Sequence, residues 1–236
     1  MNQIIDHCNY LLNNYPNRVL PYLEERATQN YFKFGYFPSL NNINLLLNYI
    51  DLSDLKSLKL IKSQESYSHI NYSNYFQNYE LIIPFYNIYG NPIALIGRTL
   101  DDYKELGIPK YKNTQYKKSS NLFGLYEGLE EIKHNDFIIL TEGQFDVIKS
   151  FDKGMKNIVA VSSSNVSQDQ FLLAKRFTNN FYLALDNDDA GKIGEQRFIS
   201  KYGKYCNVKK LNIPQDFKDV DEFFSICSLQ DMECLL

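Results

Sequence analysis

The chain is 236 residues long, with 44% apolar residues, 22% charged residues and a formal net charge of −3. This composition is too apolar for a disordered chain, and the length suits one or two globular domains. The weak negative charge excludes a protein that holds nucleic acid or a membrane through a global cationic field, so any nucleic-acid site must be a local basic patch.

Targeting and metal-binding cysteine motifs are absent from the sequence. The first thirty residues lack the basic head and apolar run of a signal peptide, and no apolar stretch approaches the ~20 residues of a membrane span. We therefore expect a cytoplasmic protein without a membrane partner. The cysteines, at positions 8, 206, 227 and 234, form no C-x-x-C pair, so no zinc is expected in this chain. Abundant Asn, Lys, Ile and Tyr indicate a low-GC genome, bacterial or viral, such as that of a phage.

The first predicted segment, residues 1–75, is an N-terminal helical segment. Between residues 6 and 60 apolar residues recur at helical spacing, as in Leu11, Leu12 and Tyr15. Pro21 suits the first turn of a second helix. After residue 63 the chain becomes polar, and no strand is predicted there.

The second predicted segment, residues 76–135, is a mixed α+β subdomain. Residues 81–85 and 93–97 read as the two strands of a β-hairpin, because a Gly90-Asn91-Pro92 turn separates two apolar runs. Residues 98–118 hold six basic residues against three acidic ones, a locally basic strip that suits phosphate contact.

The third predicted segment, residues 136–226, is an α/β domain, followed by a C-terminal tail at 227–236. Short apolar runs at 137–140, 158–161, 181–185 and 208–213 alternate with helical stretches at 145–151, 169–177 and 190–202. This alternation predicts a parallel sheet with helices on both faces. Ser167 and Gln170 form a capping box for the second of these helices.

Acidic residues follow three of the four apolar runs. Glu142 and Asp146 follow the first run, Asp186 and Asp188 the third, and Asp219 and Asp221 the fourth, a set of six. In open α/β sheets ligands bind outside the carboxyl ends of the strands. Carboxylates gathered there repel one another unless hard divalent cations neutralise them. The pattern therefore predicts Mg²⁺ or Mn²⁺, and two such ions can align a phosphate ester for in-line displacement.

These residues resemble a known family. Thr141-Glu142-Gly143-x-x-Asp146, Asp186-x-Asp188 and Asp219-x-Asp221 are similar to the three signatures of the Toprim domain. Upstream, Ile96-Gly97-Arg98, Pro109-Lys110-Tyr111-x-Asn113 and Lys118 resemble, in order, the basic subdomain of DnaG-type DNA primases. Tyr22-Leu23-x-x-Arg26 resembles the helical entry to the same polymerase domain.

The resemblance implies an RNA polymerase core that synthesises short RNA primers on single-stranded DNA from ribonucleoside triphosphates. It implies catalytic roles for Glu142, Asp186 and Asp188. The implied metal ligands are these three together with Asp146, Asp219 and Asp221, and the implied nucleic-acid and nucleotide contacts are Arg98, Lys110, Asn113 and Lys118.

The sequence also departs from the family. Glu80 stands where members usually carry an arginine, and both the zinc-binding module and the helicase-binding region are missing from the pattern. The resemblance therefore implies a bare polymerase core, with a replicative helicase as partner and a zinc-module protein acting in trans. Two alternatives stay open: a non-catalytic Toprim module that binds nucleic acid, and a Toprim metal-dependent nuclease.

Overall fold

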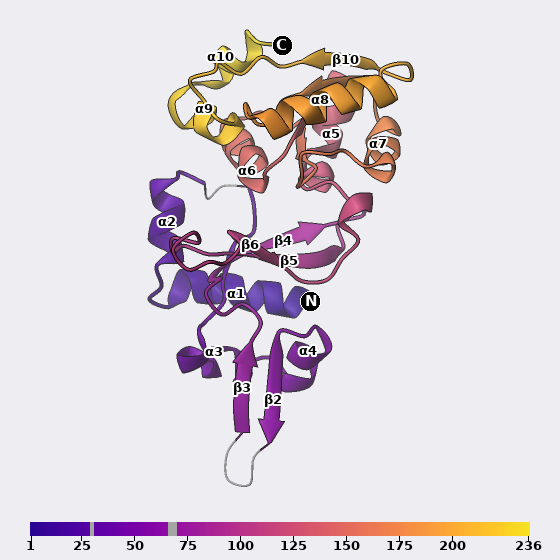
Figure 1. The fold of residues 1–236 in the computed structure, drawn as a ribbon. Helices are drawn as coiled ribbons and strands as arrows, with labels where there is room; N and C mark the ends of the chain where they lie inside the picture. Colours follow the sequence, from indigo (N-terminus) through magenta and orange to yellow (C-terminus); the bar gives the residue numbers. More distant parts are fainter. Residues whose placement is uncertain (29–30, 66–69) are drawn as a thin grey trace. The chain divides into compact units, whose positions relative to one another are not determined.

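The computed structural model describes residues 1–28, 31–65 and 70–236 (Figure 1). Contacts within the chain divide it into two compact units. Unit 1 contains residues 1–85 and 92–116, and unit 2 contains residues 86–91 and 117–236. No helix in the described ranges has the length and apolar character needed to cross a bilayer.

Unit 1 begins with short helices, as the spacing of apolar residues predicts. Their order is α1 (Asn2–Asn14), α2 (Val19–Glu25), a 3₁₀ turn η1 (Leu40–Asn42), α3 (Asn44–Leu47) and α4 (Leu52–Ser57). Pro21 lies in the first turn of α2, where the prediction placed it. Helix α1 buries Leu11 and Leu12 and packs on a short strand, so the stretch predicted as wholly helical also contributes to a sheet.

Unit 1 contains a four-stranded sheet in the order β1-β4-β5-β6. Its strands are β1 (Gly35–Tyr36), β4 (Leu81–Tyr86), β5 (Pro92–Arg98) and β6 (Tyr111–Asn113). The predicted hairpin is confirmed as β4 and β5. A second pair, β2 (Ile61–Glu65) and β3 (Ile70–Asn74), is antiparallel. Its polar sequence carries no alternation of apolar residues, which is why no strand was predicted there.

Unit 2 is built on a parallel sheet in the order β10-β9-β7-β8. The strands are β7 (Ile138–Thr141), β8 (Ile158–Ala160), β9 (Asn180–Leu183) and β10 (Asn207–Lys210). The accompanying helices are η2 (Lys118–Ser120), α5 (Leu125–Asn135), α6 (Gln144–Asp152), α7 (Gln168–Lys175), α8 (Asp189–Tyr202), α9 (Val220–Ile226) and α10 (Leu229–Glu233). The predicted α/β class, the four strands and the three helices are confirmed.

The core of unit 2 explains why its strands read as solid apolar runs. Ile138 and Leu140 share one buried cluster with Phe171 of α7 and Phe198 of α8. Ile139 is buried as well, and alternation along a strand turns it to the opposite face. Both faces of β7 are therefore covered, as expected for a parallel sheet.

The two contact units differ from the four segments predicted from the sequence. Leu122, Leu125 and Ile132 belong to the apolar cluster of the parallel sheet, so residues 117–135 lie in unit 2. The sequence placed them with the basic subdomain, because helix α5 precedes the first apolar strand run. The finer four-part division stays a prediction.

Candidate active site

The carboxyl ends of the parallel strands bring acidic residues of separate segments together. Strand β7 ends at Thr141 and is followed by Glu142, while β9 ends at Leu183, shortly before Asp186. The backbone N–H of Asp186 donates a hydrogen bond to Glu142 Oε1 at 3.4 Å. The acidic residues that follow the first and third apolar runs therefore meet at this edge of the sheet.

Lys218 is the part of this site that the sequence analysis missed. Its Nζ lies 3.1 Å from Asp186 Oδ2 and 3.4 Å from Asp219 Oδ2. Burial lowers the pKa of Lys218, but the hydrogen bond and charge of Asp186, reinforced by Asp219, outweigh it and raise the pKa above its ordinary value. The signal that could have revealed it is its position directly before the Asp219-x-Asp221 motif.

Burial and crowding raise the pKa values of the facing carboxylic acids. Burial, followed by the charges of Asp186 and Asp188, raises the pKa of Glu142 to about 7. Burial also raises the pKa of Asp186, although the contact with Lys218 opposes that effect. Neighbouring carboxylates that disfavour one another's ionisation form a site that a bound cation would stabilise.

Asp188 and Asp219 are each fixed by the helix that follows them. Asp188 Oδ1 accepts a hydrogen bond from the backbone N–H of Gly191 at 2.9 Å, which caps α8. Asp219 Oδ1 accepts one from the backbone N–H of Glu222 at 2.9 Å, which caps α9. Capping orders both carboxylates at the sheet edge through a local interaction.

Asp146 lies buried behind the cluster and connects two of its segments. Its Oδ2 accepts hydrogen bonds from Thr141 Oγ1 at 2.7 Å and from the backbone N–H of Gly143 at 2.9 Å. Its Oδ1 accepts from the backbone N–H of Asp221 at 3.0 Å. Burial, followed by the charge of Asp219, raises the pKa of Asp146 to about 7. These bonds hold the start of α9 against the turn after β7, while the metal role of Asp146 and Asp221 stays a prediction.

The donor chemistry of the cluster fits a hard divalent cation. Within residues 1–28, 31–65 and 70–236, no group of three or more His, Cys, Asp or Glu side chains is arranged closely enough to hold a metal ion. However, the facing groups are all carboxylate oxygens, the ligands that Mg²⁺ and Mn²⁺ prefer. The ammonium of Lys218 already places one positive charge between Asp186 and Asp219.

The predicted nucleic-acid contacts are divided between the two units. Arg98, Lys110 and Asn113 lie in unit 1, whereas Lys118 lies in unit 2 at the start of η2. Arg98 and Lys110 line a cavity of ≈ 440 Å³ in unit 1. Asn113 pairs with Ile96 in the sheet, and its carbonyl accepts a hydrogen bond from Tyr75 Oη at 2.6 Å.

Two tyrosines hold the guanidinium of Arg98, and the residue as a whole is only 7% exposed. Its Cζ lies 5.3 Å from the ring centroid of Tyr22 and 5.3 Å from that of Tyr111. Its Nη1 also donates a hydrogen bond to Tyr111 Oη at 2.6 Å. Stacking and hydrogen bonding together fix the direction of this cation in the cavity wall.

Glu80 is paired within unit 1. Arg18 Nη2 lies 2.9 Å from Glu80 Oε1, and Arg18 Nη1 lies 2.6 Å from Asp101 Oδ1. The hydrogen bond from Arg18 lowers the pKa of Asp101. One guanidinium therefore pairs with both carboxylates.

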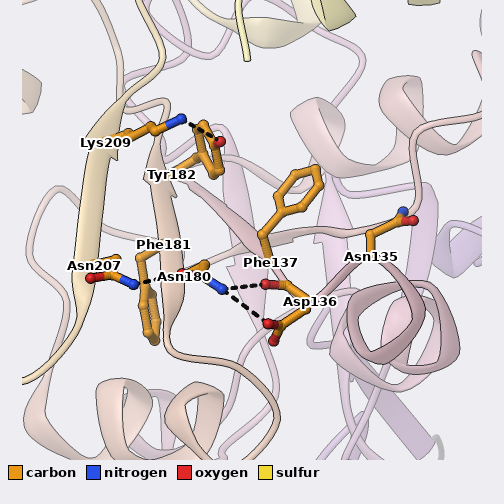
Figure 2. Close-up of a pocket in the computed structure, with 8 residues that line it drawn as sticks. All are labelled: Asn135, Asp136, Phe137, Asn180, Phe181, Tyr182, Asn207 and Lys209. Atoms are coloured by element: carbon orange, nitrogen blue, oxygen red, sulfur yellow. Dashed lines mark hydrogen bonds between the residues drawn. The ribbon is translucent and has the colours of Figure 1, made fainter.

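A second cavity, of ≈ 290 Å³, lies at the opposite, amino end of the strands (Figure 2). Figure 2 shows Asn180 between Asp136 and Asn207: its Nδ2 donates to Asp136 O at 2.8 Å, and its Oδ1 accepts from Asn207 Nδ2 at 2.8 Å. None of the predicted site residues lines this cavity. The acidic edge of the sheet is therefore the stronger candidate for chemistry.

Two family profiles together match most of the chain. The profile described as "DNA primase catalytic core, N-terminal domain" matches residues 7–129, and the profile described as "Toprim-like" matches residues 139–224. The chain is 36% identical over 162 residues to the DNA primase of Aquifex aeolicus, which covers 66% of this chain and 32% of that protein. It is 35% identical over 157 residues to the DNA primase of Clostridium acetobutylicum, covering 63% of this chain and 24% of that protein.

Solved structures extend the similarity to nearly the whole chain. The zinc-binding and RNA polymerase domains of Aquifex aeolicus primase align with a TM-score of 0.80 at 28% identity, covering 99% of this chain and 60% of that one. A DNA primase domain from Pseudomonas aeruginosa aligns with a TM-score of 0.80 at 23% identity, covering 99% and 76%, and shares the fold. The chain spans about a third or less of the full length of the DNA primases of Aquifex aeolicus and Clostridium acetobutylicum. With one profile matching more than half of its residues, the chain belongs to the DNA primase catalytic core family.

Proposed function

We propose that this chain is the catalytic core of a DNA primase, a nucleotidyltransferase that synthesises short RNA primers on single-stranded DNA during replication in the cytoplasm. The observation that carries the proposal is that Lys218 pairs with both Asp186 and Asp219 at the carboxyl edge of the parallel sheet, where the backbone of Asp186 also contacts Glu142. Membership of the family supports it.

The proposed ion ligands are Glu142, Asp186 and Asp188, with Asp219 and Asp221 completing the set. When bound there, two Mg²⁺ or Mn²⁺ ions would supply stabilisation of negative charge on the attacking and leaving oxygens of nucleotidyl transfer. The raised pKa of Glu142 reflects burial and the charges of Asp186 and Asp188, an unfavourable environment that bound divalent cations would relieve.

Lys218 provides the protein's own electrostatic contribution. Its ammonium lies within 3.4 Å of two carboxylates, so it holds Asp186 and Asp219 near each other while offsetting their repulsion. Asp146 supports the same arrangement by fixing the backbone of Asp221. These groups keep the acidic edge assembled before any substrate arrives.

Arg98, Lys110, Asn113 and Lys118 are proposed to hold the template and the incoming ribonucleotide through phosphate contacts. Phosphate contacts position a nucleic acid without reading its sequence. Of the structures similar to this chain, one is a DnaG primase catalytic domain bound to single-stranded DNA. A replicative helicase and a zinc-module protein in trans remain proposed partners.

The test is primer synthesis by the purified protein on single-stranded templates with labelled ribonucleotides and Mg²⁺ or Mn²⁺. We expect oligoribonucleotides from wild type and from Glu130→Ala, a control that removes an exposed acid paired only locally with Lys133. Asp186→Ala and Lys110→Ala should both lose the product.

Two other outcomes would refute primer synthesis. Template degradation that is lost in Asp186→Ala but retained in Lys110→Ala identifies a Toprim nuclease. Single-strand binding without any product, across varied templates and with both ions, identifies a non-catalytic binding module.

A further inference from the structure

The backbone of unit 2 holds Lys218 beside Asp186. The backbone N–H of Asn187, the residue after Asp186, donates a hydrogen bond to the carbonyl oxygen of Lys218 at 2.8 Å. The backbone N–H of Lys218 donates in turn to Glu222 Oε2 at 2.6 Å. Both backbone polar groups of Lys218 therefore have partners, and its main chain is fixed next to the acidic edge of the sheet.

The side chain of Asn187 fastens the loop that leads to Lys218. Asn187 Nδ2 lies within hydrogen-bond distance of three carbonyl oxygens of that loop, those of Phe217 at 2.7 Å and of Ile213 and Pro214 at 3.2 Å. The loop is thus attached to the residue that directly follows Asp186. The approach of Lys218 to Asp186 is therefore built into the fold and does not depend on the chance direction of a surface side chain.

The ammonium group of Lys218, unlike its backbone, is free to move. The Lys218 side chain is 63% exposed, whereas those of Asp186 and Asp219 are 16% and 22% exposed. Lysine carries a compact, strongly hydrated charge on a flexible four-carbon stem. The ammonium can therefore turn into solvent while the loop backbone and the two carboxylates keep their places.

The ammonium and a divalent ion would use the same oxygen atoms. Lys218 Nζ lies 3.1 Å from Asp186 Oδ2 and 3.4 Å from Asp219 Oδ2. Carboxylate oxygens are also the ligands that Mg²⁺ and Mn²⁺ prefer. An ammonium and a divalent cation beside the same oxygens repel each other, so the ion binds more weakly while the ammonium is in place.

We propose that Lys218 is an internal counter-ion that competes with one divalent ion for Asp186 and Asp219, and that this ion binds by displacing the Lys218 side chain into solvent. The inference rests on the proposed function, which assigns ions to these carboxylates. The apparent affinity for the ion is then lowered by the fraction of molecules in which the carboxylates are free of Lys218. Lys218 thereby sets the ion concentration at which the site fills.

The experiment measures Mn²⁺ binding to the full chain without DNA or nucleotides, from the electron paramagnetic resonance signal of free Mn²⁺. Lys218→Met keeps a long side chain but removes the charge. It should bind Mn²⁺ at least about fivefold more tightly than wild type, the factor that corresponds to the ~1 kcal/mol of one charge pair 4 Å apart in water. Circular dichroism checks that the variant is folded.

Thermal unfolding gives a second readout. Without divalent ions, Lys218→Met should unfold at a lower temperature than wild type, because Asp186 and Asp219 lose their counter-ion. Mn²⁺ should raise the unfolding temperature of Lys218→Met more than that of wild type, since tighter binding to the folded state stabilises it more.

Two further variants separate the charge of Lys218 from general effects of losing a lysine. Lys218→Arg keeps the positive charge and should bind Mn²⁺ no more tightly than wild type. Lys210→Met is the matched control, because Lys210 is also ion-paired in unit 2, with Glu195, but belongs to no proposed site. It should leave the affinity for Mn²⁺ unchanged.

A folded Lys218→Met variant that binds Mn²⁺ with wild-type affinity, or more weakly, overturns the inference, as does equal tightening in Lys210→Met. Absence of Mn²⁺ binding in both wild type and Lys218→Met overturns the inference together with the ion assignment. The proposed function fails in a different way: Asp186→Ala with wild-type affinity for Mn²⁺ overturns its ion ligands. A wild-type protein that shows the competition but makes no primers overturns primer synthesis alone.

Discussion

Replacing Gly191 by alanine is expected to displace Asp186 and to remove most of the proposed primer-synthesis activity. A Cβ at position 191 would lie 2.0 Å from the carbonyl oxygen of Asp186, whereas real Cβ atoms essentially never approach another atom within 3.0 Å. The difference, 3.0 minus 2.0, means that α8 and Asp186 must separate by at least 1.0 Å. A displacement of this size at a reacting centre costs about 100-fold in rate.

The matched control is Gly128→Ala, which creates the same kind of collision away from the acidic edge. Its Cβ would lie 2.0 Å from the carbonyl oxygen of Lys156. Both variants should lose ~1–3 kcal/mol of unfolding free energy, the usual cost of overpacking, measured by urea titration. Only Gly191→Ala should lose its activity at a temperature where both are folded. Equal activity in the two variants would refute the reasoning.

Three further outcomes are expected. Burial raises the pKa of Glu127 from 4.5 to about 7. Ionising Glu127 in the folded protein therefore lowers the free energy of unfolding, and this loss grows as the pH rises from 4.5 to 7. In urea unfolding, Glu127→Gln should have a free energy of unfolding up to ~3 kcal/mol higher than wild type at pH 8.5 and equal to it near pH 4. An equal gain at both pH values would contradict this linkage. Ser167→Ala should cost ~1 kcal/mol, because Ser167 Oγ caps α7 at 3.1 Å from the N–H of Gln170, and Ser167→Asp should restore most of it. Asp146→Ala leaves three donors without their acceptor and should cost ~3 kcal/mol in urea unfolding, whereas a cost below that of Ser167→Ala would show that its hydrogen bonds matter little.

The parallel sheet and its acidic edge could be predicted because each depends on short segments of sequence. An unbroken apolar run such as 137–140 indicates a strand that is buried on both faces. The carboxyl end of each run determines where the acidic residue that follows it lies, as for Glu142 and Asp186. The local signals of capping, such as Ser167 with Gln170, were sufficient for the same reason.

The parts that escaped prediction depend on contacts between distant segments. Lys218 meets Asp186 across 32 positions, and Tyr22 meets Arg98 across 76, as the residue numbers show. Each residue lies in or beside a motif, Lys218 directly before Asp219-x-Asp221 and Tyr22 within Tyr22-Leu23-x-x-Arg26, but neither motif indicates which distant side chain the residue contacts. Strand β6 was also missed, because three half-buried residues are too few to show alternation.

Unit 2 does not correspond to one continuous piece of chain, and this affects how the protein can be dissected. Residues 86–91 belong to it: the Tyr86 ring lies 6.0 Å from that of Tyr126, and a Cβ at Gly90 would meet the Tyr126 ring at 2.7 Å. A fragment that begins at residue 117 would leave that face of Tyr126 uncovered. Grafting the acidic edge into another protein therefore requires the hairpin turn to be transplanted with it, as a second insertion.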